Sequence, residues 1–184
     1  MKDLAHRIAR LEAESQIRQL VARYCFYIDD RQRDLIGTLF TDDATLRSAD
    51  GVMNATGVDA ILDQYDGRFD VLGPGHHFMH DVLIDFVGDG QTEAIGRVSG
   101  HAELWRMNRM MVAAIRYDDV YRNTDDGWKF ADRVINFLYY VAVADYPDIL
   151  RTPMRNHAYP DPRPADFPEA LPSWIAYEKS RGRG

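Results

Sequence analysis

The sequence predicts an α+β fold in which N-terminal helices cover the concave side of a curved, antiparallel or mixed sheet and enclose a cone-shaped pocket. Apolar residues recur every three or four positions from Ile17 to Ile28, which is typical of a helix with one buried face. Downstream, turn signals rich in Gly, Asp and Asn separate four long predicted strands, at 77–86, 93–107, 111–122 and 128–141. The length of 184 residues suits one domain with a sizeable core.

The N-terminal apolar stripe begins upstream of Ile17, so residues 3–29 are expected to form one long helix or two joined helices. This helix ends at Asp29 and Asp30, which places a carboxylate beside its apolar face. A second, short amphipathic segment is predicted at 35–40. The chain therefore begins with two helical segments before the first strand.

Shorter elements precede the long strands. Residues 44–47 and 52–56 are predicted strands on either side of a turn, and a helix is expected from Gly57 to about Tyr65. Residues 68–75 are predicted to form a loop, because Gly and Pro alternate at its end. The order strand, strand, helix and then four strands fits a sheet covered by helices.

The C-terminal segment differs in composition from the rest. Seven of the eight prolines follow residue 146, which predicts an extended tail at 146–184 behind a folded domain at 1–145. One short helix is expected near 173–180. The tail retains apolar residues, so we expect it to cap the pocket or to wrap a neighbouring subunit.

Composition excludes several classes of function. The net charge of -7, with scattered Lys and Arg, makes nucleic-acid binding improbable. The longest apolar runs are too short for a membrane span, and the N-terminus does not resemble a secretion signal. The single cysteine, Cys25, lies on the apolar helix face and is expected to be a core thiol, consistent with a reducing cytoplasm.

A histidine cluster opens the third predicted strand. Because side chains alternate along a strand, His77, Met79 and Asp81 share one face, and His76 and His80 share the other. Alternation alone does not decide which face meets the pocket. A metal site at His76 and His80 is improbable, because the two residues are too far apart along a strand to bind one ion.

The N-terminal half resembles the SnoaL-like branch of the nuclear transport factor two superfamily, which includes scytalone dehydratase, bile-acid dehydratase and lindane dehydrochlorinase. The matching residues are Ile17, Leu20, Tyr24, Asp29, Leu39, Phe40, Asp43 and Ala44. The resemblance implies a cystatin-like α+β barrel with an internal pocket. It also implies a homo-oligomer, a trimer or a dimer, built on the outer face of the sheet.

The same resemblance implies a catalytic pair. His77 occupies the position of the family histidine, judged by its spacing to Phe86 and to the Gly88-Asp89-Gly90 turn, and Asp29 matches the aspartate at the helix end. Asp81 stands where the family usually has Asn. A carboxylate that orients one imidazole nitrogen makes the other nitrogen a competent general base. The alternative is that Asp29 only ends a helix and His77 is structural.

Further site residues are expected around this pair. Tyr24 and Arg133 are candidates to assist a leaving group, the latter by resemblance to the dehydrochlorinase, although Arg133 could equally pair with an acidic neighbour. Aromatic, thioether and polar side chains are candidates for substrate binding: Tyr27, Phe40, Met79, Asp81, His101, Trp105, Met111 and Phe137. Core packing is the competing interpretation for most of the apolar ones.

The sequence contains no nucleotide-binding glycine motif, no CxxC and no serine hydrolase elbow, so no cofactor and no metal is expected. These features favour a cofactor-independent lyase that acts on a small apolar molecule, aromatic or polycyclic. One alternative is an isomerase or polyketide cyclase that uses the same base. Another is a non-catalytic assembly subunit, like the small subunit of ring-hydroxylating dioxygenases.

Overall fold

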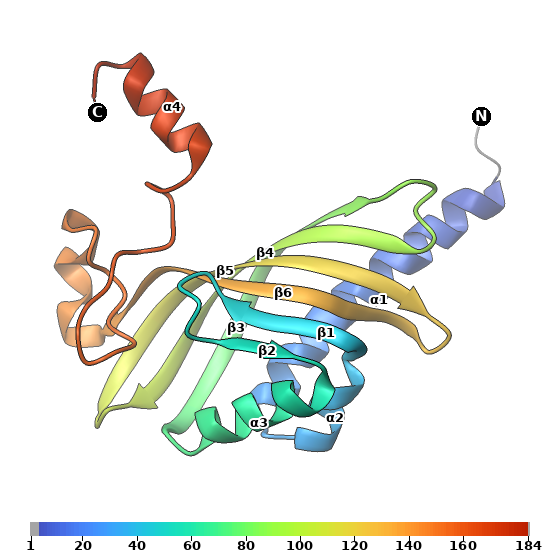
Figure 1. Cartoon of the computed structure of the whole chain (residues 1–184), viewed down its shortest axis with the longest axis horizontal. Coiled ribbons are helices and arrows are strands. Elements are labelled where there is room, and N and C mark those ends of the chain that lie inside the picture. Colours follow the sequence, from blue (N-terminus) through green and yellow to red (C-terminus); the bar gives the residue numbers. More distant parts are fainter. Residues whose placement is uncertain (1–3, 184) are drawn as a thin grey trace.

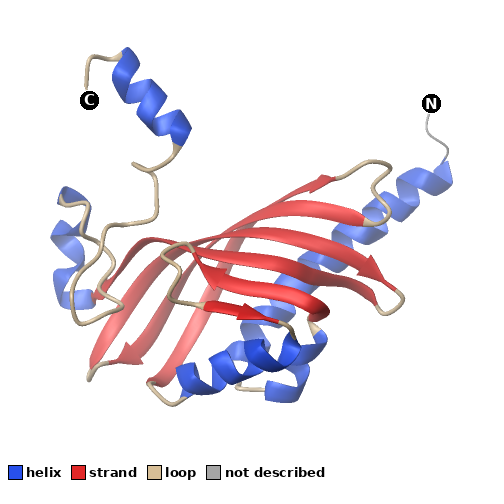
Figure 2. Cartoon of the chain, viewed as in Figure 1, coloured by secondary structure: helices blue, strands red, loops and turns tan. Residues whose placement is uncertain are grey.

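The computed structural model describes residues 4–183 and contains a six-stranded sheet together with helices near both ends of the chain (Figures 1 and 2). The helices are α1 (Leu4–Asp29), α2 (Arg33–Thr38), α3 (Val58–Phe69), the 3-10 helix η1 (Val143–Arg151) and α4 (Pro172–Ser180). The strands are β1 (Phe40–Ser48), β2 (Asn54–Thr56), β3 (Leu72–Phe86), β4 (Glu93–Arg106), β5 (Arg109–Thr124) and β6 (Gly127–Ala142). The predicted α+β fold class is confirmed.

The strands follow the order β2-β1-β6-β5-β4-β3. β1 runs parallel to β6, and every other neighbouring pair is antiparallel, so the sheet is mixed. Long strands twist and curve. The curved sheet forms a shallow trough, and α1 crosses behind it in Figure 1, with α2 and α3 at one end.

The core lies between α1 and the concave face of the sheet. The apolar stripe of α1 is buried as predicted, with Ile17, Leu20 and Val21 no more than 5% exposed. On β5, Ala113 and Tyr117 are buried on the same face, and the ring of Tyr117 packs edge-on against Tyr24 of α1. Burial of such apolar side chains contributes roughly 1.5–3 kcal/mol each, which is what closes the sheet onto the helix.

The first of the four long strands, β3, begins earlier than predicted. α3 continues to Phe69 and β3 starts at Leu72, so the expected loop at 68–75 is reduced to residues 70–71 and is otherwise wrong. The glycines serve close strand packing here: a Cβ on Gly75 would lie 2.9 Å from Cβ of Leu104 on β4. A Cβ on Gly73 would lie 3.0 Å from Cδ1 of Trp105. The same residues that resemble a turn signal therefore allow two strands to approach.

The C-terminal tail packs along β6 beyond the point where β1 ends. The amide of Tyr140 donates to the Arg155 carbonyl at 2.9 Å, and the His157 amide donates to the Tyr140 carbonyl at 2.7 Å. Arg155 is 2% exposed and binds the Glu169 carboxylate, with 2.7 Å between Nη2 and Oε2. The tail thus covers a free strand edge of its own sheet, which would otherwise be open to pairing with other chains.

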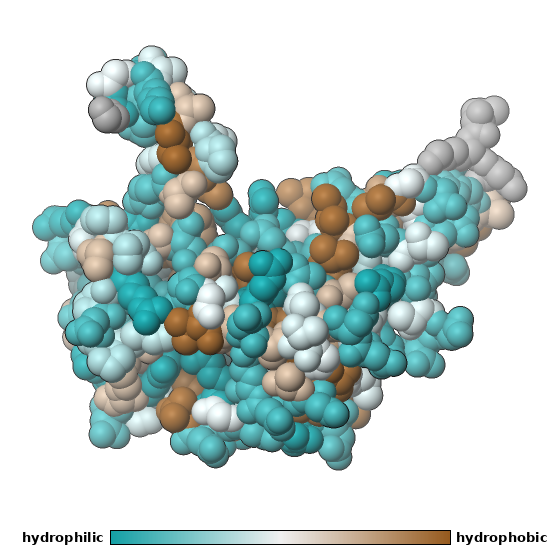
Figure 3. Space-filling view, viewed as in Figure 1, coloured by the Kyte–Doolittle hydropathy of each residue, from teal (hydrophilic) through white to brown (hydrophobic). Residues whose placement is uncertain are grey.

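The last helix, α4, has the bounds expected from the sequence to within one residue and stands away from the body in Figures 1 and 3. None of its residues is buried. No helix within residues 4–183 is long and apolar enough to cross a membrane. The division into a domain at 1–145 and an extension at 146–184 stays a prediction.

Candidate functional site

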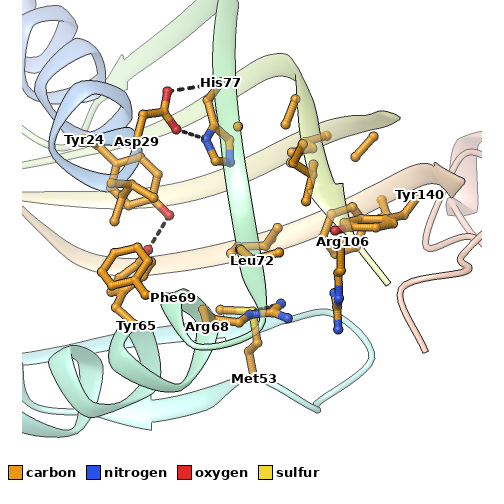
Figure 4. A pocket seen from close by; sticks show the side chains of 18 of the residues that line it. Tyr24, Asp29, Met53, Tyr65, Arg68, Phe69, Leu72, His77, Arg106 and Tyr140 are labelled. Carbon is orange, nitrogen blue, oxygen red and sulfur yellow. Dashed lines mark hydrogen bonds and ion pairs between the residues drawn. The ribbon is translucent and has the colours of Figure 1, made fainter. Parts of the chain in front are cut away.

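A pocket opens between α1, α3 and the concave face of the sheet (Figure 4). The pocket has a volume of about 110 Å³. Its wall is mainly apolar and aromatic, with side chains contributed by Tyr65, Phe69, Tyr117, Phe137 and Tyr140. Such a lining with a few converging polar groups is characteristic of a small-molecule site.

Asp29 and His77 meet at the wall of this pocket, as Figure 4 shows. The carboxylate contacts the imidazole at 2.6 Å, between Oδ1 and Nδ1, and accepts the backbone amide of His77 at 2.8 Å on Oδ2. The side chain of Asp29 is only 7% exposed. With a proton on Nδ1 donated to the carboxylate, Nε2 is left as the basic nitrogen toward the pocket.

A second histidine approaches the same carboxylate from outside. Nδ1 of His76 lies 2.9 Å from Oδ2 of Asp29, and its side chain is 48% exposed. His76 packs against Phe26 and Phe78 rather than in the pocket wall. Asp29 is therefore held by groups on both sides of β3, which fixes its position.

Tyr24 lines the pocket one helical turn before Ile28 and is 3% exposed. Its hydroxyl lies 2.5 Å from the hydroxyl of Tyr65 on α3. Burial raises the pKa of Tyr24, although the nearby positive charge of Arg133 opposes this, and burial raises the pKa of Tyr65 well above its ordinary value. Both phenols consequently stay protonated near neutral pH and are available as hydrogen-bond donors.

Arg133 is not part of the pocket lining. It is fully buried beneath Tyr24, and it binds Asp119 through Nε and Nη2, each at 2.8 Å. The guanidinium carbon lies 4.0 Å from the centres of the Tyr24 and Phe130 rings. The pairing with an acidic neighbour, one of the two expected alternatives, is what the structure shows, but in the core rather than at the surface.

A bulge in β3 separates His77 from Asp81. The pairing with β4 shifts between Met79 and Val82, so side-chain alternation changes phase there. Met79 packs against the core, whereas Asp81 is exposed and receives a long hydrogen bond of 3.5 Å from the Ser99 hydroxyl. The prediction that Asp81 faces the pocket together with His77 is therefore wrong, because it assumed an uninterrupted strand.

His101 and Trp105 lie on the outer face of β4. Their neighbours Ala102 and Leu104 are the residues of this strand that line the pocket, and alternation directs His101 and Trp105 the other way. Nδ1 of His101 contacts Nε2 of His80 at 2.8 Å, and Trp105 is 47% exposed. Their predicted substrate contacts are not possible in this arrangement.

The remaining predicted substrate-binding residues divide between wall and core. Phe137 lines the pocket. Phe40 is buried against Tyr24 and Phe130, and neither Tyr27 nor Met79 is in the lining. Met111 is buried and borders a separate depression near the tail. For these four, core packing was the better interpretation.

The sequence analysis missed much of the pocket lining, including three arginines, Arg31, Arg68 and Arg106. Arg68 on α3 and Arg106 at the end of β4 both line the pocket, and Figure 4 shows them across it from Asp29 and His77. No local motif marks either residue. The two residues come from elements far apart in the sequence, and only the folded chain brings both to the pocket wall.

Among residues 141–183, which the structure describes, none lines the pocket, so this part of the tail does not cap it. The expectation of a contact with a neighbouring subunit stays a prediction. Within residues 4–183, no group of three or more His, Cys, Asp or Glu is arranged to hold a metal ion. The chemistry available at the pocket is that of Asp29, His77, the tyrosines and the arginines.

The chain is similar to known proteins in sequence and in fold. The sequence profile of the SnoaL-like domain matches residues 9–134, whereas no curated protein sequence matches significantly. Among solved structures, a candidate scytalone dehydratase from Novosphingobium aromaticivorans is 22% identical, with a TM-score of 0.67, over 74% of this chain and 91% of that one. A hexachlorocyclohexane dehydrochlorinase from Novosphingobium barchaimii is 20% identical, with a TM-score of 0.69, over 75% and 94%.

A third similar structure is an NTF2-like protein with a cystatin-like fold, also from Novosphingobium aromaticivorans. It is 25% identical, with a TM-score of 0.62, over 75% of this chain and 92% of that one. These similarities confirm the predicted cystatin-like fold.

Proposed function

Because the chain belongs to the SnoaL-like domain family, we propose that it is a cofactor-independent lyase acting on a small, largely apolar cyclic molecule. The observation that carries this proposal is the contact of 2.6 Å between Asp29 and His77 at the wall of an apolar pocket. A buried carboxylate that fixes one imidazole nitrogen leaves the other to accept a proton from carbon or oxygen. The dehydratase and dehydrochlorinase among the similar folds are named for elimination reactions, which need such a base.

The reaction can be written with side chains alone. Nε2 of His77 takes a proton from a ring carbon, and the electron pair of that C–H bond forms a C=C bond as the adjacent C–O bond breaks. Asp29 stabilises the imidazolium cation through Nδ1–H. The departing hydroxide then takes the proton from His77 and leaves as water, which restores the neutral imidazole.

Tyr24 is placed to assist the leaving group. Its hydroxyl can accept the Tyr65 proton and donate its own proton toward the pocket, because the two hydroxyls are 2.5 Å apart. The raised pKa of Tyr24, which burial causes, keeps this donor neutral. Arg133 acts on the reaction only through Tyr24, against whose ring it packs at 4.0 Å, so we assign it a positioning role.

The isomerase alternative uses the same base but leaves the mass of the substrate unchanged.

The open pocket argues against a purely structural subunit, since a chain without a ligand has no need to keep a lined cavity of about 110 Å³.

A panel of cyclic β-hydroxy ketones and β-hydroxy acids tests the proposal, with product mass as the readout. We expect loss of one water from at least one member. Asp29→Asn and His77→Asn should each lower the rate by about a hundredfold or more. His80→Asn is the matched control, because His80 lies on the same strand but on its outer face, against His101.

Unchanged circular dichroism of each variant would show that folding is intact. A fully active His77→Asn variant would rule out the proposed base. A product of unchanged mass would assign the chain to the isomerase alternative instead.

A further inference from the structure

Three arginines line the pocket, namely Arg31, Arg68 and Arg106. Arg31 is exposed and donates to the Leu72 carbonyl at 2.5 Å, so Arg68 and Arg106 are the two that lie deeper without an acidic partner. Arg68 and Arg106 are both partly buried, and neither forms an ion pair with a carboxylate anywhere in the described part of the chain. Acidic residues are not scarce, since the chain has a net charge of -7. A partly buried guanidinium without a carboxylate is costly unless something else satisfies it.

The protein contacts of these two arginines are weak. The polar contact of Arg68 is with the thioether of Met53, at 2.9 Å between Nη2 and Sδ, and a thioether is a poor acceptor. The guanidinium carbon of Arg106 lies 5.7 Å from the centre of the Tyr140 ring. Burial raises the pKa of Tyr140, whereas a hydrogen bond with Arg106 and the charges of Arg106 and Arg68 oppose this rise. Both arginines therefore act on the same wall of the pocket, and the partner of Arg106 there is a neutral phenol.

The only carboxylate in the pocket lining is Asp29, and its oxygens already contact His76 and His77. Figure 4 shows the pocket with this pair on one side and the two guanidinium groups on the other. In this view Leu72 lies between the two sides, and the ring of Phe69 lies to one side of the pocket. A ligand that complements the pocket therefore has an apolar body and a negatively charged group at one end.

We propose that the substrate is a cyclic carboxylate whose charged group is bound by Arg68 and Arg106 while its ring lies against His77. This inference rests on the proposed function for the role of His77, but not for the binding of the anion. Guanidinium groups bind carboxylates through paired, charge-assisted hydrogen bonds, which fix orientation as well as position. Anchoring the carboxylate at one wall would hold a ring carbon near Nε2 at the other.

The size of the pocket sets the size of the ring. An apolar cavity of about 150 Å³ holds benzene. The space of about 110 Å³ found here approaches that value, and the pocket opens to solvent. The enclosed part therefore takes at most one ring, and a second ring or substituent would extend into the mouth.

Isothermal titration calorimetry of the whole chain tests the proposal without knowledge of the natural substrate. The probes are benzoate, cyclohexanecarboxylate and 2-naphthoate, each compared with the neutral alcohol that has CH₂OH in place of the carboxylate. We expect at least one carboxylate to bind at least tenfold more tightly than its alcohol. The preference should weaken as salt is added, because it is electrostatic.

Variants locate the effect. Arg68→Gln and Arg106→Gln should each reduce the preference for the carboxylate, and the double variant should abolish it. Arg97→Gln is the matched control, because Arg97 is an exposed arginine on β4 that pairs with Asp118 and lies outside the pocket. Arg68→Lys keeps the charge and should retain part of the preference.

The comparison of carboxylate with alcohol in the unmodified protein decides the matter even if a variant fails to fold. Equal affinity for the two, no binding of any carboxylate, or tighter binding of phenyl phosphate than of benzoate would each overturn the proposal. Retention of the preference in a folded double variant would also overturn it. Because His77→Asn should lose activity but still bind carboxylates, failure of the anion site and failure of the proposed base are distinguishable.

Discussion

Replacement of Asp119 by Asn should lower the free energy of unfolding by about 3–5 kcal/mol, because it leaves Arg133 charged and buried without its counter-ion. Both side chains are 0% exposed, and two hydrogen bonds of 2.8 Å join them. The carboxylate also accepts the Tyr121 hydroxyl at 2.8 Å. An amide keeps one acceptor oxygen but directs its NH₂ group toward donors. Since domains are commonly stable by about 5–15 kcal/mol, the loss is a large part of the total.

Urea unfolding followed by circular dichroism measures this loss. Asp118→Asn is the control, since Asp118 is the next residue, pairs with exposed Arg97 and is itself 42% exposed. We expect it to cost less than about 1 kcal/mol. The double variant Asp119→Leu/Arg133→Met should recover much of the stability, because it removes both charges together. An Asp119→Asn variant no less stable than Asp118→Asn would refute the reasoning.

Two further substitutions test the electrostatics and the packing of the sheet. Burial would raise the pKa of Asp132, but hydrogen bonds including those from Arg47 outweigh it and lower the pKa. The resulting stabilisation is present above the unfolded-state pKa of about 4 and is lost as pH falls through the lower folded-state pKa. Asp132→Asn should therefore lower the free energy of unfolding, measured with urea, by about 1 kcal/mol at pH 7 and by progressively less in acid. A loss of stability that does not change with pH would contradict this. Gly96→Ala places a Cβ 2.5 Å from Cε2 of buried Tyr121 and should lower the free energy of unfolding by about 1–3 kcal/mol. Gly67→Ala is the control, because a Cβ there meets nothing within 4 Å and should be neutral or stabilising. Equal thermal stabilities of the two variants would show the packing argument to be wrong.

Much of the architecture was predictable because its signals are local. The apolar stripe from Ile17 to Ile28 defines the buried face of α1, and its end at Asp29 places that carboxylate beside the core. Strand length and turn residues located β4, β5 and β6 to within a few residues. Family resemblance then selected His77 among the neighbouring histidines, and the structure brings it into contact with Asp29.

The errors arise where local signals are ambiguous. Gly73 and Gly75 have the composition of a turn, but they allow β3 to approach β4. The bulge after Met79 reverses the alternation that assigned Asp81 to the pocket. A one-residue change of phase moves every later side chain to the other face of a sheet, and sequence alternation alone does not reveal it.

Other residues depend on contacts between distant segments. Arg133 lies opposite Asp119 in the pairing of β5 with β6, so its buried ion pair follows from strand register rather than from any motif. Arg68 and Arg106 belong to a helix and a strand far apart in the sequence. Their shared place in the pocket wall emerges only once the fold is known.

The central claim is that Asp29 holds His77 in the tautomer with a proton on Nδ1, which leaves Nε2 basic toward the pocket. Nuclear magnetic resonance of ¹⁵N-histidine-labelled protein measures this directly, with His77→Asn used to assign the signal among the six histidines. The account predicts that the neutral form of His77 carries its proton on Nδ1 and loses this preference in Asp29→Asn. A neutral form that carries its proton on Nε2, or a tautomer unaffected by Asp29→Asn, would contradict it.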